Sequence, residues 1–526
     1  MKIATTDSLT PTSGTRKIST LQLVLLSTGG MIGSGWLFSP FYGFQTAGVG
    51  VLLSWFITAL LSLIIGLAFA EVATILPIVG GVMRFMGVTH SRSLGFMFVV
   101  LGWVSYIVYL PLEAQSAIQY LGFWVPSLVK DGAHGVSLSS LGLGMALGVM
   151  IFLTWFNTLH LSKVSKTNAV VSMWKIVIPL AIALGMIIAF ANPQHLLTNQ
   201  HLPKLAFEPI LLAITSSGLA FAFAGFQNGL ILANSAQNPR RAIPLSIFAP
   251  ILIGWILYSS LSLMFILCLP SDKFSLLAAV APLLGLLSLF GLHYIYVVLF
   301  IDAIIAPLGT ANVYTTVTGR ILFGLGREFF PQSVLTKLNS CAAPYAALWI
   351  NALLGACFLL PFPTWSQLVD FLSSLTLLSC LSGPIALIVL REKFPDLERK
   401  FKLPYYKLFG YLGFASCGLF VYWSGEHNLY YLVLLIVAVA ILYTLIFARD
   451  KPLQVFKHSW YLIAYILVLY AISASHQQQW LSFPLDNLLV FVLSLGFTKI
   501  FLLQQDSREN ILVNIRKLTA EVKSDN

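Results

Sequence analysis

Long apolar stretches constrain this chain more than any other feature of its sequence. A helix needs about 20 mostly apolar residues to cross a bilayer, because lipid offers the backbone no hydrogen-bond partners. Hydrophobic residues make up 58% of the chain and charged residues 9%, against roughly 25% charged in soluble domains. The sequence predicts an all-α polytopic membrane protein with about fourteen (12–14) spans. The candidates are 21–44, 51–76, 95–120, 140–158, 168–191, 211–234, 245–269, 288–317, 344–361, 365–390, 406–425, 428–448, 459–475 and 484–503.

The basic residues indicate how the chain is oriented. The net charge is +11, but the lysines and arginines are scattered among short connections rather than gathered in one patch. With a cytoplasmic N-terminus, nearly all of them fall on the inner side, and only Lys130, Lys204 and Lys273 fall outside. We therefore expect both termini in the cytoplasm, a location in the plasma membrane (the bacterial inner membrane), and no nucleic-acid partner.

Patterns typical of soluble enzymes do not occur in the sequence. It has no HExxH, no P-loop and no strand–turn–helix GxGxxG, and the glycines at 29–35 lack the βαβ unit that a dinucleotide loop needs. The five cysteines show no CxxC spacing, which indicates neither a disulfide framework nor a zinc site. We expect a protein that is not an enzyme and that binds no cofactor and no metal.

Helix-breaking residues concentrate in the first and sixth spans. The first contains GGMIGSGWLF (29–38), and the sixth contains Gly218, Gly225 and Gly229. Two interrupted helices five spans apart are what an inverted five-plus-five repeat produces, with both breaks near the bilayer midplane. Glycines also let neighbouring helices pack closely, but the corresponding positions of the two interruptions favour a binding site.

The broken first span resembles the first-helix signature of the amino acid/polyamine/organocation (APC) permeases. Further landmarks of that family follow in order: FAEVATILPIVGG (69–81), FAFAGFQNG (221–229), NPRRAIPLSI (238–247), GRILFGLGREFFPQSVLTKLN (319–339) and LREKFPDLERKFKLP (390–404). The resemblance covers roughly 20 to 450. Among the branches of the family, GSGWLF followed closely by proline is most similar to relatives of the bacterial aspartate:proton symporters.

The resemblance implies a LeuT-like fold, with ten core helices in two inverted repeats and accessory helices after them. It divides the chain into a cytoplasmic N-terminal arm (1–20), a transport core (21–390), accessory spans (391–505) and a cytoplasmic tail (506–526). Repeat one is then 21–191 and repeat two is 211–390. The apolar residues of the tail fall on one helical face, which predicts a helix lying on the inner leaflet or one that binds a partner.

An amino acid presents a carboxylate and an ammonium group, and a broken helix complements both. The N-terminus of a half-helix offers free N–H groups and a positive dipole, and the preceding carbonyls accept hydrogen bonds from an ammonium group. Glycine suits such a break because it adopts unusual dihedrals. The resemblance assigns the substrate carboxylate to Ser34 and Gly35, with Ile32 and Gly33 nearby.

The sixth span is expected to complete the substrate site. The resemblance assigns the amino group to the carbonyls around Phe221, Ala222 and Ala224. Phe221 also matches an aromatic residue that covers the substrate as an outer gate in related permeases, and ordinary aromatic packing is the alternative. Gln227 stands where many family members carry glutamate. A neutral amide can bind a substrate but cannot carry a coupling proton.

Two ionisable residues inside the spans are candidates for proton coupling, because a charge in the membrane interior costs about 2.5 to 3.5 kcal/mol on insertion scales. Lys175 matches a lysine of proton-coupled relatives that stands near the sodium site of sodium-coupled members. The alternative is a lysine that snorkels to the cytoplasmic interface. Glu113 in the third span is expected to contact the substrate or the proton, with a structural pair or a place in the outer vestibule as alternatives.

Other polar residues of the spans suggest structural roles as well. Glu71 matches a family glutamate near the cytoplasmic end of the second span, where we expect a structural or gating salt bridge with a loop arginine. Asp302 lies in the eighth span without an evident partner. In the tenth span, Ser373, Ser374 and Thr376 could line the pocket, and hydrogen bonding within the bundle explains them equally well.

Together these patterns predict a secondary active amino acid transporter, an amino acid:proton symporter that works by alternating access. The expected partners are a small amino acid substrate, the coupling proton and the lipid bilayer. Two alternatives remain open. One is an amino acid or amine antiporter, which a cationic substrate paired with Glu113 would favour. The other is a transporter-like sensor or a channel, which counterflow of labelled substrate distinguishes from a carrier.

Overall fold

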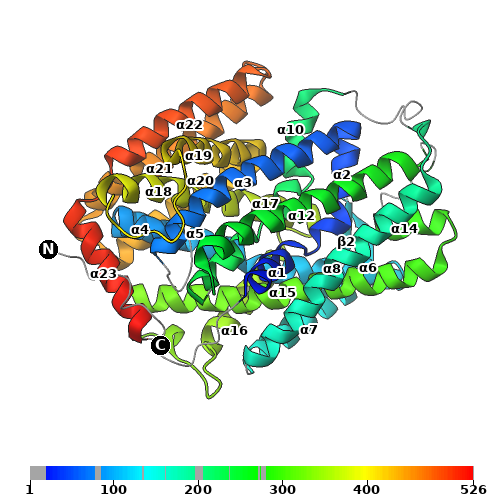
Figure 1. Cartoon of the computed structure of the whole chain (residues 1–526), viewed down its shortest axis with the longest axis horizontal. Helices are drawn as coiled ribbons and strands as arrows, with labels where there is room; N and C mark the ends of the chain where they lie inside the picture. Colours follow the sequence, from blue (N-terminus) through cyan, green and yellow to red (C-terminus); the bar gives the residue numbers. More distant parts are fainter. Residues whose placement is uncertain are drawn as a thin grey trace.

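The computed structural model describes residues 19–76, 84–132, 135–159, 161–195, 205–235, 237–270, 273 and 280–524. Its regular structure is helical apart from one antiparallel hairpin of β1 (Val129–Gly132) and β2 (Gly135–Leu138). The helices run roughly along the long axis of the view, with α4 (Phe85–Thr89) and α23 (Arg508–Ser524) at the left and α14 (Pro282–Leu289) at the right (Figure 1). The described chain is therefore a helical bundle.

The helix boundaries follow the expected order of spans. The segment assigned to repeat one forms α1 (Thr20–Met31), α2 (Gly35–Ala47), α3 (Val51–Ile75), α5 (Arg92–Ile107), α6 (Tyr109–Leu121), α7 (Ser140–Asn157) and α8 (Leu161–Phe190). The segment assigned to repeat two forms α10 (Phe207–Ser216), α11 (Leu219–Phe223), the 3-10 helix η5 (Phe226–Ser235), α12 (Pro239–Cys268), α15 (His293–Phe329), α16 (Tyr345–Phe358), α17 (Trp365–Ser379) and α18 (Ser382–Lys393). The helices α19 (Tyr406–Trp423), α20 (Glu426–Phe447), α21 (Pro452–Gln477) and α22 (Leu485–Leu503) follow.

Each predicted span coincides with one helix or with helices joined by a break. Within the described ranges, 10 helical stretches are long and apolar enough to cross a membrane, or 11 if the bent pair of α10 and α11 is one span. One of these stretches contains both α2 and α3. The apolar helices α1 and α16 are too short to be counted among them. The all-helical membrane fold is confirmed, whereas the count of fourteen is approximate.

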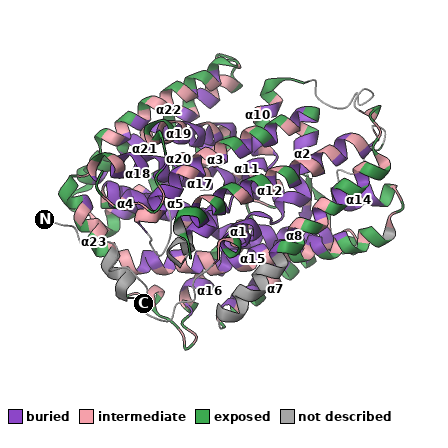
Figure 2. Ribbon diagram, viewed as in Figure 1, coloured by how far each residue is buried: buried purple, intermediate pink, exposed green. Residues whose placement is uncertain are grey.

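The outer helices present apolar side chains to their surroundings. On α7, for example, Ile151, Phe152 and Trp155 are exposed, and exposed residues recur along the outer helices (Figure 2). A large exposed apolar surface suits acyl chains rather than water. The ionisable residues Glu113 and Lys175 are instead buried inside the bundle.

The helices that follow α18 contact the sixth span. His476 at the end of α21 lies 3.5 Å from the Glu208 carboxylate of α10 and 3.2 Å from the Asp486 carboxylate of α22. On α10, the Thr215 hydroxyl donates a hydrogen bond to the carbonyl of Trp423 in α19. These accessory helices therefore hold α10, the half of the sixth span that precedes its break.

The C-terminal segment packs against the connection between α3 and α5. The Asp506 N–H donates to the Thr89 carbonyl at 3.0 Å, and the Asn514 amide donates to two carbonyls of α4 at 3.4 Å each. On the apolar face of α23, Ile511 is fully buried. The amphipathic face predicted for the tail is therefore used, at least in part, against the chain itself.

His90, between α4 and α5, is buried against this C-terminal segment. Its Nε2 lies 3.0 Å from the Phe501 carbonyl, and its Nδ1 lies 2.8 Å from the Thr89 hydroxyl. Burial lowers the pKa of His90 from 6.5 to about 4, because a buried imidazolium loses its hydration. The folded protein therefore keeps this histidine neutral at pH values where the unfolded chain protonates it.

We expect the protein to lose stability as the pH falls from about 6.5 toward 4. In that window the unfolded chain binds a proton at His90 that the folded chain does not, which favours unfolding by up to about 3 kcal/mol. The measurement is the thermal denaturation midpoint in detergent at neutral and acidic pH, for the wild type and for His90→Gln. The glutamine stays neutral, so its midpoint should fall less on acidification; equal shifts in both proteins would contradict the assignment.

Candidate functional site

The first span is interrupted at residues 32–34. The Ile32 N–H still donates to the Thr28 carbonyl at 2.9 Å, but Ile32 then leaves the helical conformation, with φ −85° and ψ 84°. The next helix, α2, begins at Gly35, and the side chain of its N-cap residue, Ser34, makes no capping hydrogen bond. The first N–H groups of α2 therefore open into the protein interior, where they can bind an anion.

The sixth span is interrupted twice. Gly218 (φ 74°) separates α10 from α11, which are bent by 58°, and Gly225 (φ 110°) lies between α11 and η5. Both φ values lie in the left-handed region that glycine adopts without strain. A Cβ atom on Gly225 would also lie 2.9 Å from the Gly30 carbonyl carbon. The two broken spans therefore touch backbone to backbone.

Glu113 of α6 lies directly at the first break. Its side chain is fully buried, and its Oε2 accepts a hydrogen bond from the Ser34 N–H at 2.8 Å. A Cβ atom on Gly33 would lie 2.2 Å from Oε1, so glycine makes room for the carboxylate. A carboxylate of the protein thus occupies the helix N-terminus at which the sequence predicts the carboxylate of a substrate. The alternative of an outer-vestibule position for Glu113 is wrong.

Lys175 of α8 lies at the C-terminal end of α1. Its Nζ donates to the Thr310 hydroxyl at 2.7 Å and to the Gly29 carbonyl at 3.2 Å. The Thr310 hydroxyl lies 3.1 Å from the Ile32 carbonyl, to which it can donate. Only 1% of Lys175 is exposed, so the alternative of a snorkelling lysine is wrong. Its ammonium group instead places positive charge where the α1 carbonyls end.

We call the interruption of the first span the first break and those of the sixth span, taken together, the second break. The carbonyls of the second break already accept hydrogen bonds within the protein. The Phe221 carbonyl accepts from the Ala224 N–H at 2.8 Å, and the Ala222 carbonyl accepts from the Tyr258 hydroxyl at 2.9 Å. Because a carbonyl has two lone pairs, each can accept one more bond from an ammonium group. A Cβ atom on Gly35 would lie 3.1 Å from the Ala222 Cβ, so the two breaks face each other.

Aromatic rings cover the site on the side of α17. The Phe221 ring centroid lies 5.7 Å from that of Tyr109 and 6.0 Å from that of Trp365. The Trp365 indole N–H donates to the Ser34 hydroxyl at 2.9 Å. Sequence reasoning singles out Phe221 but neither Tyr109 nor Trp365, because their contacts depend on how α6 and α17 are rotated. One signal is available for Trp365: the capping residue Thr364 precedes it directly, which places Trp365 at the very start of α17.

The comparison with known families decides what this bundle is. A model of the amino acid permease family matches residues 18–469. The chain belongs to this family. It is 29% identical over 503 residues to the aspartate-proton symporter of Bacillus subtilis (strain 168), covering 91% of this chain and 95% of the relative. It is also 29% identical over 425 residues to the glutamate/serine transporter AimA of the same organism, covering 78% and 77%. Membership confirms the predicted family and a transporter rather than an enzyme.

Solved transporter structures share the fold of the permease. The manganese transporter of Eremococcus coleocola, in complex with an aromatic bis-isothiourea substituted compound, matches with a TM-score of 0.53 at 13% identity over 95% of each chain. Two mutants of that transporter match with a TM-score of 0.52. At such low identity the likeness concerns the fold alone. It confirms the LeuT-like arrangement with accessory helices that the sequence predicts.

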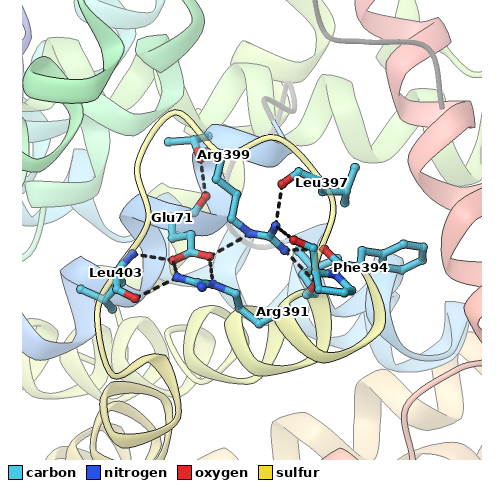
Figure 3. A network of polar contacts seen from close by, with 9 residues as sticks. Glu71, Arg391, Phe394, Leu397, Arg399 and Leu403 are labelled. Carbon is cyan, nitrogen blue, oxygen red and sulfur yellow. Dashed lines mark hydrogen bonds and ion pairs between the residues drawn. The ribbon is translucent and has the colours of Figure 1, made fainter. Parts of the chain in front are cut away.

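Away from the two breaks, Glu71 of the permease forms a buried ionic cluster with the last turn of α18 and the loop that follows it. Arg391 binds its carboxylate through two N–H groups at 2.5 and 2.8 Å, and the Arg399 Nε lies 3.0 Å from it. The Leu403 N–H donates to the same carboxylate at 2.7 Å. Figure 3 shows both guanidinium groups turned toward this one carboxylate. The cluster fixes the end of α3 to the loop between α18 and α19.

Gln227 contacts one of the two breaks of the permease, whereas Asp302 hydrogen-bonds to neither among the described residues. The Gln227 amide donates to the Tyr106 hydroxyl at 3.0 Å and accepts from the Gly225 N–H at 3.2 Å. Asp302 is buried on α15, eight residues before Thr310 in the sequence and so about 12 Å from it along the helix. Gln227 therefore shapes the second break, whereas the Asp302 carboxylate makes no hydrogen bond to the first within the described part of the chain.

Proposed function

We propose that this permease is a secondary active transporter that carries an amino acid together with protons by alternating access. The substrate binds between the two broken spans, at Ile32, Gly33, Ser34 and Gly35. The observation that carries the proposal is the hydrogen bond from the Ser34 N–H to the Glu113 carboxylate. The N-terminus of α2 is suited to a carboxylate, and the carboxylate it holds here belongs to a residue that can itself carry a proton.

Competition between two carboxylates couples the substrate to the proton. When the substrate carboxylate takes the Ser34 N–H, Glu113 loses this donor while it stays buried. A buried carboxylate without a partner costs several kcal/mol, and protonation relieves that cost. Glu113 therefore gains a proton as the substrate binds and releases it when the substrate leaves. Because both ligands bind together, this scheme favours symport over exchange.

Lys175 supplies a positive charge beside this site. Its ammonium group binds the Gly29 carbonyl at the end of α1 and the Thr310 hydroxyl. In our proposal it takes the place that a sodium ion holds in sodium-coupled members of the superfamily. A lysine at this position neutralises the helix carbonyls without a metal ion. Together with Glu113, it forms the proton-coupling pair.

The relatives support this proposal through the activities in their names, an aspartate-proton symporter and a glutamate/serine transporter. We place the permease in a plasma membrane, the bacterial inner membrane, with both termini in the cytoplasm. We propose 21–390 as its transport core, Phe221 as the outer gate and the Glu71 cluster as the cytoplasmic gate. The clusters of aromatic and ionic contacts around these two residues are consistent with closure on either side.

Uptake into proteoliposomes tests the proposal. Purified permease is reconstituted, and the uptake of each of the twenty amino acids is measured with and without an inward proton gradient. We expect accumulation of at least one amino acid only when the gradient is present, together with counterflow of labelled substrate, which a channel does not produce. The proposal fails if no amino acid is taken up, or if uptake ignores the gradient.

Replacing Lys175 by alanine should reduce gradient-driven uptake by about 10-fold or more, because the α1 carbonyls and Glu113 lose their nearby cation. Initial uptake rates are measured with and without the proton gradient. Lys499→Ala is the matched control, since Lys499 also lies in a span but is exposed. If the Lys175 variant still accumulates substrate in response to the gradient, this lysine has no part in coupling.

A further inference from the structure

A small cavity lies between the second break and α17. It is enclosed by α3, by α11 with η5, and by α17. The hydroxyl and amide residues that line it are Ser62, Gln227, Ser373 and Thr376. The other described residues of its wall are apolar or cysteine, so none of the lining residues is charged. The cavity is therefore a neutral space with hydrogen-bonding groups on its wall.

Two hydroxyl groups of α17 lie at this cavity without a partner. Ser373 and Thr376 are 2% and 5% exposed, and neither hydroxyl makes a hydrogen bond within the described part of the chain. A serine or threonine in a helix can bond to the carbonyl four residues earlier, as Ser374 does with Asp370 at 2.8 Å. A buried unsatisfied group costs about 1–3 kcal/mol. The two hydroxyls therefore leave hydrogen-bonding capacity free at the cavity wall.

The cavity is continuous with the residues proposed to hold the substrate. Phe221 and Ala224 of the second break belong to its wall, and the Phe221 ring lies 3.4 Å from a Cβ atom built on Gly35 at the start of α2. Ser373 and Thr376 are three residues apart, so their side chains share one face of α17. A substrate with its carboxylate at α2 can therefore extend its side chain past Phe221 toward that face.

We propose that this cavity is the side-chain subsite of the permease, and that Ser373 and Thr376 select a small neutral side chain bearing a hydroxyl or an amide. The inference rests on the function proposed above. A charged side chain would be buried without an opposite charge on the cavity wall, which is costly. An aliphatic side chain would leave both hydroxyls unpaired. Among small side chains, those of serine, threonine and asparagine avoid both costs.

The test compares serine with alanine, which differ by one hydroxyl group. The kcat/KM of uptake is measured for both substrates in the reconstituted wild type and in the double variant Ser373→Ala/Thr376→Val. We expect the wild type to prefer serine, and the double variant to lose roughly 10- to 100-fold in serine uptake through two lost hydrogen bonds, with alanine uptake preserved. Ser374→Ala is the control, because its hydroxyl already bonds to the Asp370 carbonyl.

The possible outcomes separate the subsite from the function on which it rests. An unchanged serine-to-alanine ratio in a variant that still transports alanine overturns the subsite alone. More efficient uptake of aspartate or glutamate than of serine by the wild type overturns the neutral selection. A wild type that transports no amino acid overturns the proposed function first. If the double variant does not fold, the serine-to-alanine ratio is measured in the single variant Thr376→Val, which keeps the side-chain shape.

Discussion

Replacing Glu113 by glutamine should lower proton-driven accumulation of substrate by at least about 100-fold. Glutamine keeps the shape of the side chain, and its carbonyl can still accept the hydrogen bond that the Ser34 N–H donates at 2.8 Å. It cannot take up a proton when the substrate displaces it. We therefore expect the variant to bind substrate and to catalyse counterflow, with rates that no longer depend on pH, since it resembles the protonated glutamate throughout.

The measurements are initial rates of uptake and of counterflow in the same proteoliposomes. Glu392→Gln is a suitable control, because Glu392 is a half-exposed glutamate that pairs with the exposed Lys407. It should leave both rates within about twofold of the wild type. Accumulation by the Glu113 variant in response to a proton gradient would show that the coupling proton binds elsewhere, and the competition between two carboxylates would then be abandoned.

Removal of the Glu71 carboxylate should destabilise the protein by about 3–5 kcal/mol, since it leaves buried charge uncompensated. The side chains of Arg391 and Arg399 are 10% and 3% exposed, and both contact this carboxylate. In Glu71→Ala, two guanidinium groups would remain close together without their anion. The loop that ends at Leu403 would also lose the acceptor of its N–H. We therefore expect the C-terminal end of α3 to detach from the loop.

The stability prediction is measured as the thermal denaturation midpoint in detergent, together with the fraction of monodisperse protein on gel filtration. Glu392→Ala is the comparison, because it removes an exposed ion pair that is worth about 0–1 kcal/mol. A Glu71→Ala protein as stable as this control would mean that the arginines find other acceptors. Arg399 already donates to the carbonyls of Phe394 and Leu397, so the loop offers a specific alternative to look for.

The broken spans could be predicted from the sequence because clustered glycines have few other uses inside a membrane helix. Gly33 and Gly225 both lie where a side chain would collide with a neighbour. Glu113 and Lys175 could be singled out because charge inside a membrane is costly. Thr310, which binds Lys175, and Trp365, which binds Ser34, could not be singled out. They reach the first break only through the rotation of α15 and α17, which one sequence does not reveal.

Hydropathy also misplaced several helix ends, for a physical reason. The span predicted at 168–191 belongs to a helix that begins at Leu161, and the one predicted at 288–317 belongs to a helix that continues to Phe329. Hydropathy reports where a helix meets lipid, whereas the backbone hydrogen bonds continue into the aqueous region. The landmark at 319–339 thus begins within α15, which ends at Phe329.

The connection between the second and third spans constrains the order in which the bundle is completed. This connection emerges early during synthesis, but the groups that bind it, the Phe501 carbonyl and the Asp506 N–H, belong to the last span and its exit. Until those residues are made, the imidazole of His90 must stay hydrated, because a buried polar group needs its partner. We therefore expect this end of the bundle to close late during synthesis, and a chain truncated ahead of Phe501 to leave His90 without this partner.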